Sequence, residues 1–158
     1  MKLSPDAVVR ECERLRERGP QVVALANDVR DDLGDAFGVD VDEVTERQYE
    51  RTLDEVFADG ALAVNVAALA ALLRELDVTD DYPGFVVDEL LGRELAAMLA
   101  GRQPLRLLAE ATFHYADIRA DSAAAGDDDL DAALAAGFQT RVPGWDWRET
   151  DPFGVDPE

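Results

Sequence analysis

Signals that start and stop helices recur along this chain, and they constrain its fold more than any other feature. In the first segment Ser4 stands where an N-cap is expected, Pro5 follows at the first helical position, and Gly19 with Pro20 marks the end. Three apolar residues between these signals share one helical face: Val8, Cys12 and Leu15. The pattern therefore predicts an amphipathic helix whose apolar face is turned to a core.

Six further segments carry the helical pattern, while the alternation typical of strands is almost absent. These segments are residues 21–38, 42–58, 61–76, 85–101, 104–126 and 128–137. The fourth helix is the most apolar and is expected to be central, whereas the seventh is expected to be short. Because the connections are only a few residues long, we expect antiparallel neighbours. The predicted fold class is all-α: a single-domain bundle of six to seven short helices with an irregular, tryptophan-containing C-terminal tail.

The helical spacing also predicts which side chains fill the core. Eight are expected to be largely buried: Cys12, Val29, Leu53, Leu69, Leu72, Leu90, Met98 and Leu108. A chain of 158 residues with 47% apolar residues can enclose one sizeable core, so no second domain is required. Residues 1–142 are therefore assigned to the helical bundle.

The tail, residues 143–158, is predicted to be extended because its prolines and glycines interrupt a helix. It holds three large apolar side chains, Trp145, Trp147 and Phe153. In an extended segment, residues two apart point to the same side, so the two indoles are expected to face one surface together. Two outcomes are open: the tail packs on its own bundle, or these three residues anchor an interface with a second copy or another protein.

The chain is strongly acidic, with 35 Asp and Glu residues against 15 Lys and Arg and a net charge of −20. Among the basic residues, only Lys2 is a lysine. The apolar fraction is too large for disorder, so the carboxylates must cover a folded body. Molar salt shortens the screening length to about 3 Å and removes most of the repulsion between them. This composition resembles that of proteins from extreme halophiles, where an acidic surface does not indicate a basic partner.

No targeting or membrane segment is expected. Residues 1–10 lack the apolar stretch of a secretory signal. The longest apolar run, residues 61–73, is shorter than the roughly 20 residues that span a bilayer. The single cysteine, Cys12, fits a reducing compartment. The sequence thus predicts a cytoplasmic protein with no membrane partner.

Motifs of common enzyme classes are missing from the sequence. It has no phosphate-binding loop, dinucleotide fingerprint, paired CxxC or HExxH motif. Its two serines, Ser4 and Ser122, lie in no nucleophile elbow, which argues against serine hydrolase chemistry. A single histidine cannot supply the two ExxH motifs of a ferritin-like two-metal site. Glu43 and Glu46 form an ExxE pair but lack the ExxD partner of helical nucleotide pyrophosphatases. No cofactor is therefore expected.

The most concentrated set of reactive side chains lies on the sixth predicted helix. Glu110, His114 and Asp117 form one stripe there, with Leu107 and Ile118 beside it. This spacing lets a carboxylate and an imidazole converge on one cation or act as a general base, although a second helix would have to add a ligand. The favoured interpretation is a histidine at the edge of the core, oriented by Glu110 or Asp117. No metal site is assigned on this basis.

A cluster of arginines in the first helix is unusual in so acidic a chain. Arg10, Arg14 and Arg18 lie at i,i+4 spacing on one face, as an anion-binding site would require. Glutamates alternate with them, so Arg10 can pair with Glu13 and Arg14 with Glu17. A salt-bridged face, or one that clamps an acidic neighbour, is the favoured interpretation. The net charge argues against a nucleic-acid partner.

Two functions from different classes remain open. The favoured one is a non-enzymatic binding or scaffolding domain that acts through protein–protein contacts, with a second copy or with another protein. It requires an exposed apolar patch without convergent polar groups. The alternative is a metal-dependent carboxylate enzyme, a hydrolase that uses Glu110, His114 and Asp117 in a concave polar pocket.

Overall fold

The computed structural model describes residues 2–76, 90–119 and 125–144, except for the side chains of residues 125–128. Over these ranges the regular secondary structure consists of seven helices and no strand. The prediction of an all-α, single-domain bundle is thereby confirmed. The tail residues Trp145, Trp147 and Phe153 lie outside the described residues.

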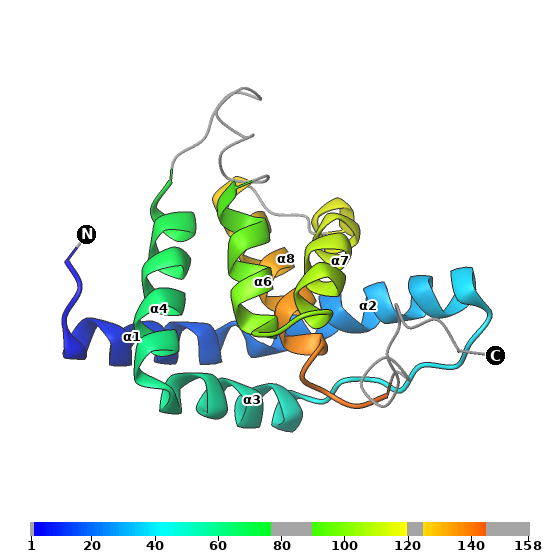
Figure 1. The fold of residues 1–158 in the computed structure, drawn as a ribbon, viewed down its shortest axis with the longest axis horizontal. Coiled ribbons are helices and arrows are strands. Elements are labelled where there is room, and N and C mark those ends of the chain that lie inside the picture. Colours follow the sequence, from blue (N-terminus) through cyan, green and yellow to red (C-terminus); the bar gives the residue numbers. More distant parts are fainter. Residues whose placement is uncertain (1, 77–89, 120–124, 145–158) are drawn as a thin grey trace.

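The first two helices follow each other almost without a break. α1 spans Pro5–Glu17 and α2 spans Gly19–Phe37, and together they lie along the long axis of the molecule (Figure 1). Ser4 caps α1 as predicted, because its hydroxyl oxygen accepts a hydrogen bond from the Ala7 amide at 3.1 Å. Pro20 was expected to help end the first segment, but it lies in the first turn of α2. Proline is tolerated there because the first amides of a helix have no intrahelical acceptor.

The next two helices are separated by a single residue. α3 spans Glu46–Ala58 and α4 spans Gly60–Glu75. α3 begins later than the predicted residue 42, because Thr45 and Gln48 form a reciprocal capping box that fixes its first turn. Within the described part of the chain, no single helix is both long and apolar enough to cross a membrane. α3 and α4 pass that test only as a pair bent by 113°, by length and composition alone.

The last three helices are α6, Arg93–Ala100, α7, Leu105–Arg119, and α8, Ala125–Gln139. One wide turn, residues 90–92, precedes α6. Leu90 in that turn is 56% exposed, so the prediction that it is buried is wrong. A wide turn shifts the phase of the helical pattern, and Leu91 packs against the core in place of Leu90.

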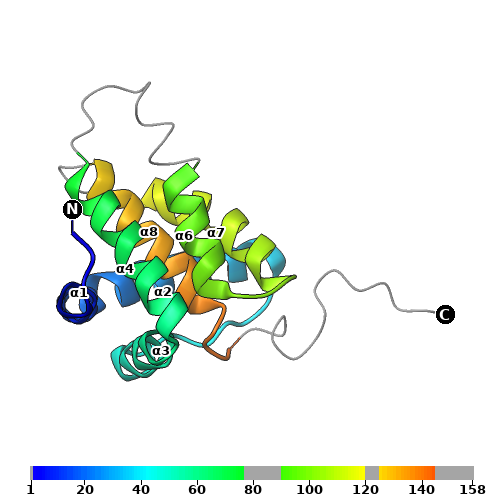
Figure 2. The same cartoon turned by 60° about the vertical axis from the view of Figure 1, so that its left-hand side comes forward.

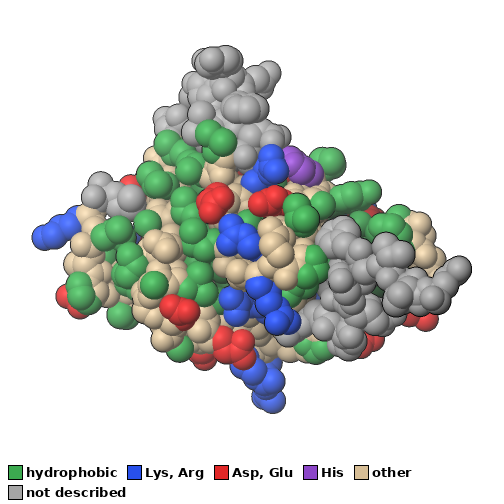
Figure 3. Space-filling view, viewed as in Figure 1, with side chains coloured by type: hydrophobic (Ala, Val, Ile, Leu, Met, Phe, Trp, Pro, Cys, Tyr) green, Lys and Arg blue, Asp and Glu red, His purple; other side chains and the backbone are tan. Residues whose placement is uncertain are grey.

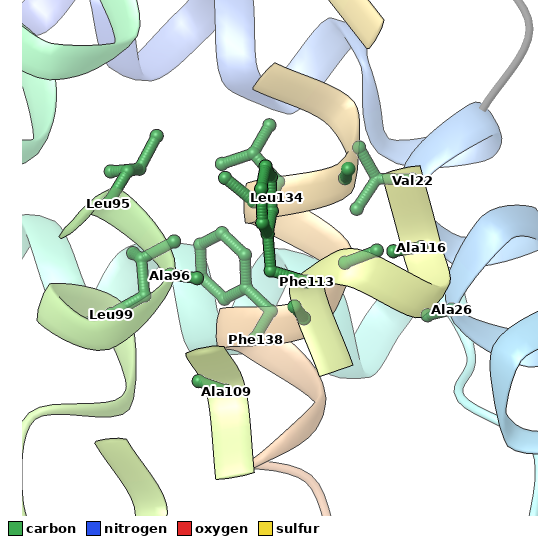
Figure 4. Close-up of a cluster of buried hydrophobic side chains, with 14 of the residues drawn as sticks. Val22, Ala26, Leu95, Ala96, Leu99, Ala109, Phe113, Ala116, Leu134 and Phe138 are labelled. Atoms are coloured by element: carbon green, nitrogen blue, oxygen red, sulfur yellow. The ribbon is translucent and has the colours of Figure 1, made fainter. Parts of the chain in front are cut away.

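The helix at the centre of the bundle is α8, not α4. α8 lies among α2, α4, α6 and α7 and packs against all four (Figures 1 and 2). The sequence predicted only a short seventh helix and gave the central place to the fourth, because the alanines and Gly137 of α8 carry little apolar area. Those small side chains let neighbouring backbones approach: a Cβ added at Gly137 would lie 2.5 Å from the Cβ of Leu99. Figure 4 shows Leu95 and Leu99 of α6, Phe113 of α7 and Leu134 and Phe138 of α8 meeting in this core.

The other predicted core residues are all at least partly buried, but they differ in how deeply they are buried. Val29 and Leu53 are fully buried. Four more are partly buried and pack against the core: Cys12, Leu69, Met98 and Leu108. Leu72 is half-buried. The helical spacing therefore identified the inward faces, while the depth of burial depends on neighbours that spacing alone does not specify.

Tyr49 joins α3 to the start and end of the bundle. Its hydroxyl donates a hydrogen bond to the Leu15 carbonyl oxygen at 2.5 Å. Its ring meets the Phe138 ring of α8 edge-on, with centroids 5.0 Å apart. Burial raises the pKa of the Tyr49 hydroxyl well above its ordinary value, since the ionised form would lose its hydration. The side chain therefore acts as a neutral structural link.

Arg30 of α2 is almost completely buried, at 1% exposure, and its guanidinium lies among backbone carbonyls. Nη1 donates to Asp42 O at 2.7 Å and to Pro143 O at 3.1 Å. Nη2 donates to Gln139 O at 3.0 Å and to Val142 O at 3.1 Å. The carbonyl groups at the end of a helix have no intrahelical donor and carry partial negative charge. Arg30 supplies donors there and ties the end of α8 to α2 and to the connection before α3.

Candidate functional site

The three side chains considered for a metal or general-base site are all half-buried on α7. Glu110 points to α6, where its carboxylate lies 3.7 Å from the Arg93 guanidinium. The His114 ring lies edge-on to Phe113, with centroids 5.6 Å apart. Over the described ranges, no three or more His, Cys, Asp and Glu side chains are grouped to hold a metal ion. The hydrolase role of Glu110, His114 and Asp117 stays a prediction.

α7 has two apolar faces instead of one. The inner face is buried in the bundle: Leu105, Ala109, Thr112, Phe113 and Ala116. The outer face, here called the outer stripe, is exposed and consists of Leu107, Ala111, Tyr115 and Ile118. At 85% exposure, Ile118 is the most exposed large apolar side chain in the described ranges. In Figure 3, on the face that carries α6 and α7, green hydrophobic side chains lie beside the purple histidine together with basic and acidic ones.

The arginines of α1 are divided among different partners. Arg18 leaves the predicted stripe and binds Asp131 of α8, with Nη1 2.7 Å from the carboxylate. Arg14 pairs with Glu11 at 3.5 Å and not with Glu17. Arg10 is exposed and makes no ion pair with any described residue. The first helix therefore clamps an acidic neighbour through Arg18, as one of the two interpretations expected, while Arg10 and Arg14 face a different surface.

The single thiol is half-buried and lies beside a cation. Burial raises the pKa of Cys12 above its ordinary value, while the Arg16 guanidinium, 3.9 Å from the sulfur, acts in the opposite direction. The thiolate is the nucleophilic form of cysteine. A raised pKa therefore makes Cys12 a poor nucleophile, consistent with a packing role on α1.

A family model described as "Domain of unknown function (DUF7984)" matches residues 1–157. The chain belongs to the DUF7984 family. The match covers the helical bundle and the tail alike. No curated protein and no solved structure matches the chain.

Two features of this DUF7984 domain are not indicated by the motifs of its sequence. Tyr115 and Ile118 belong to the exposed outer stripe, whereas the sequence pattern places Ile118 only beside the stripe of Glu110, His114 and Asp117. The sequence does carry a signal for the outer stripe, because the apolar residues of α7 spread over more of the helix than one buried face requires. Arg74 lies beside the arginines of α1 because α4 packs on α1. Only the tertiary fold brings those two helices together, so no local signal could have revealed that contact.

Proposed function

We propose that this DUF7984 domain is a non-enzymatic helical interaction domain that binds a second copy of itself through the outer stripe of α7. The observation that carries the proposal is the exposure of four apolar residues on a helix whose opposite face is already buried. Monomeric proteins rarely leave large apolar side chains in a continuous exposed patch unless the patch is used.

The spacing of the outer stripe suits a helix as the docking element. Leu107, Ala111, Tyr115 and Ile118 follow one another at intervals of four, four and three residues. This spacing keeps them on one side of the helix along three turns. A second helix can lay its own apolar stripe against such a seam. The second copy presents an identical seam, which meets that requirement without any further partner.

The charge of α7 makes this helix a favourable contact surface between two copies of the chain. Two basic residues, Arg106 and Arg119, and two acidic ones, Glu110 and Asp117, make α7 neutral overall. The whole chain carries a net charge of −20. Two copies repel each other least where the local charge is balanced. α7 therefore combines the most exposed apolar side chain with a neutral edge.

The same proposal places the domain in a salt-rich cytoplasm. Support comes from the acidic composition and from the screening of its charges at molar salt. Association of two strongly acidic copies is expected to strengthen as potassium chloride rises, because long-range repulsion falls while the apolar contact remains. The salt dependence of assembly thus tests both parts of the proposal together.

Sedimentation equilibrium in molar potassium chloride provides the test, with wild type compared with Ile118→Gln. We expect wild type to dimerise and Ile118→Gln to weaken the dimer by about tenfold or more, because Ile118 is the most exposed large apolar side chain of the stripe and would lose its burial against the second copy. Val9→Gln is the matched control, because Val9 is 63% exposed on α1 and lies away from the outer stripe. A wild type that stays monomeric at all concentrations, or an Ile118→Gln variant that dimerises as well as Val9→Gln, would refute the proposal.

A further inference from the structure

A cationic hollow lies between α1 and α4, on a different part of the bundle from the outer stripe. It encloses about 140 Å³. Six charged residues line it: Lys2, Arg10, Arg14 and Arg74, with the carboxylates Glu11 and Glu75. Four cations against two carboxylates leave an excess of two positive charges. Such an excess is the reverse of the chain as a whole, which is acidic.

The ion pairs inside the hollow hold some of these cations in place. Glu11 is buried, and its two carboxylate oxygens bind Arg74 of α4 and Arg14 of α1. Arg74 also lies 3.9 Å from Glu75. The one buried carboxylate therefore holds two guanidinium groups in place, one from each helix. This pair of cations is offset by a single negative charge from Glu11.

Arg10 and Lys2 supply the other two positive charges of the hollow. Neither side chain makes an ion pair with the described residues, and both are exposed at the hollow. Arg10 lies one turn before Arg14 on α1, and both residues line the hollow. The apolar part of the lining comes from Leu3, Ala7, Ala67 and Ala71. A ligand in this hollow would thus meet both guanidinium donors and apolar side chains.

We propose that the hollow between α1 and α4 binds a small phosphate monoester. A monoester carries a charge of about −1.5 to −2 at pH 7, which matches the excess of two positive charges. Guanidinium groups donate paired hydrogen bonds to phosphoryl oxygens, and several of them can bind one phosphoryl group. Leu3 and the alanines contact the organic part of the ligand. Arg10 donates directly to the phosphoryl group, while Glu11 positions Arg14 and Arg74.

Titration with inorganic phosphate and with phenyl phosphate, followed by amide chemical shifts at constant ionic strength and pH 7.5, tests this site. We expect saturable shifts at Ala7, Arg10, Ala71 and Arg74, and tighter binding of phenyl phosphate than of inorganic phosphate. Arg10→Gln should weaken binding by about tenfold or more, the effect of losing one charge-assisted hydrogen bond. Arg10 has no internal ion pair, so this variant removes no contact that holds the fold together.

Arg47→Gln on α3 is the control, because Arg47 is also exposed but lies outside the hollow. It should bind phenyl phosphate as wild type does. Three results would each overturn the site: no saturable shifts with either ligand, shifts confined to other helices, or equal affinity in wild type and Arg10→Gln. Phenyl phosphate that binds no tighter than inorganic phosphate would overturn the assignment to a monoester.

Discussion

α7 and α8 have the same length, 15 residues, yet they occupy opposite kinds of environment. Every residue of α8 from Asp129 to its end at Gln139 is buried, apart from the half-buried Asp131. α7 buries one face and exposes large apolar side chains on the other. The helix with the smaller side chains is therefore the more deeply buried. Close approach of backbones, and not apolar area, decides which helix lies at the centre of this bundle.

The contacts of Gly137 explain that difference. A Cβ added at this position would come within 3.0 Å of the Ala96 carbonyl oxygen as well as of the Leu99 side chain. α8 and α6 thus touch through backbone atoms, which bulky residues would prevent. Leu107, Tyr115 and Ile118 could not fit into such a contact, and in α7 they lie on the side that faces no other described helix.

The largest predicted effect concerns the anchor that holds the end of α8. Arg30→Met should lower the free energy of unfolding by about 3–5 kcal/mol, because the buried carbonyl oxygens of Gln139 and Val142 lose the guanidinium donor. Urea denaturation at constant molar potassium chloride measures the change. Arg51→Met on α3 is the control for loss of one positive charge at an exposed site, and it should stay within about 0.5 kcal/mol of wild type. Equal stability of the two variants would mean that Arg30 is no anchor.

A matched pair of truncations compares the two helices directly. Leu134→Ala in α8 should cost about 2–5 kcal/mol, because it opens a cavity among fully buried side chains. Ile118→Ala in α7 should change the stability by no more than about 0.5 kcal/mol when measured on dilute, monomeric protein. Differential scanning calorimetry checks both variants. If Ile118→Ala costs as much as Leu134→Ala, the outer stripe is covered within the monomer and the comparison fails.

The smallest predicted destabilisation tests the close approach of α8 and α6. Gly137→Ala should destabilise the protein by about 1–3 kcal/mol, because the new methyl group overlaps Leu99. Alanine is the better helix former by roughly 1 kcal/mol, so a contact with room to spare would instead give a gain. Gly60→Ala, where no atom lies within 4 Å, provides the control and should be neutral or slightly stabilising. The sign of the difference in melting temperature between the two variants decides the matter.

The parts of the fold that could be predicted from sequence are those set by local chemistry. Ser4 could be identified as a cap because the residues that it caps are its immediate neighbours. Leu90 could not be placed, because the wide turn at residues 90–92 changes the helical phase. The central position of α8 was equally hidden, since small side chains give a weak apolar pattern whether a helix is buried or exposed. Local spacing thus locates helices better than it ranks their burial.

The candidate sites divide in the same way. The sequence places Glu110, His114 and Asp117 along one side of a helix, but not the Arg93 that binds Glu110 from α6. It identifies Arg10 and Arg14 as a pair, but Arg74 joins them only through the packing of α4 on α1. The hollow therefore depends on residues that are far apart in sequence, on helices whose pairing is a property of the whole bundle, whereas the outer stripe lies within the single helix α7.

Arg30 also has a consequence for the order in which the protein can form during synthesis. Its acceptors Gln139, Val142 and Pro143 follow it by 109 to 113 residues. Until those residues have left the ribosome, a buried guanidinium at this position would lack three of its carbonyl partners. The N-terminal helices can therefore form early, but the interior around Arg30 must stay hydrated until the end of α8 arrives. Contacts at such long separation slow folding, and here they make the last part of the bundle to be synthesised the one that closes it.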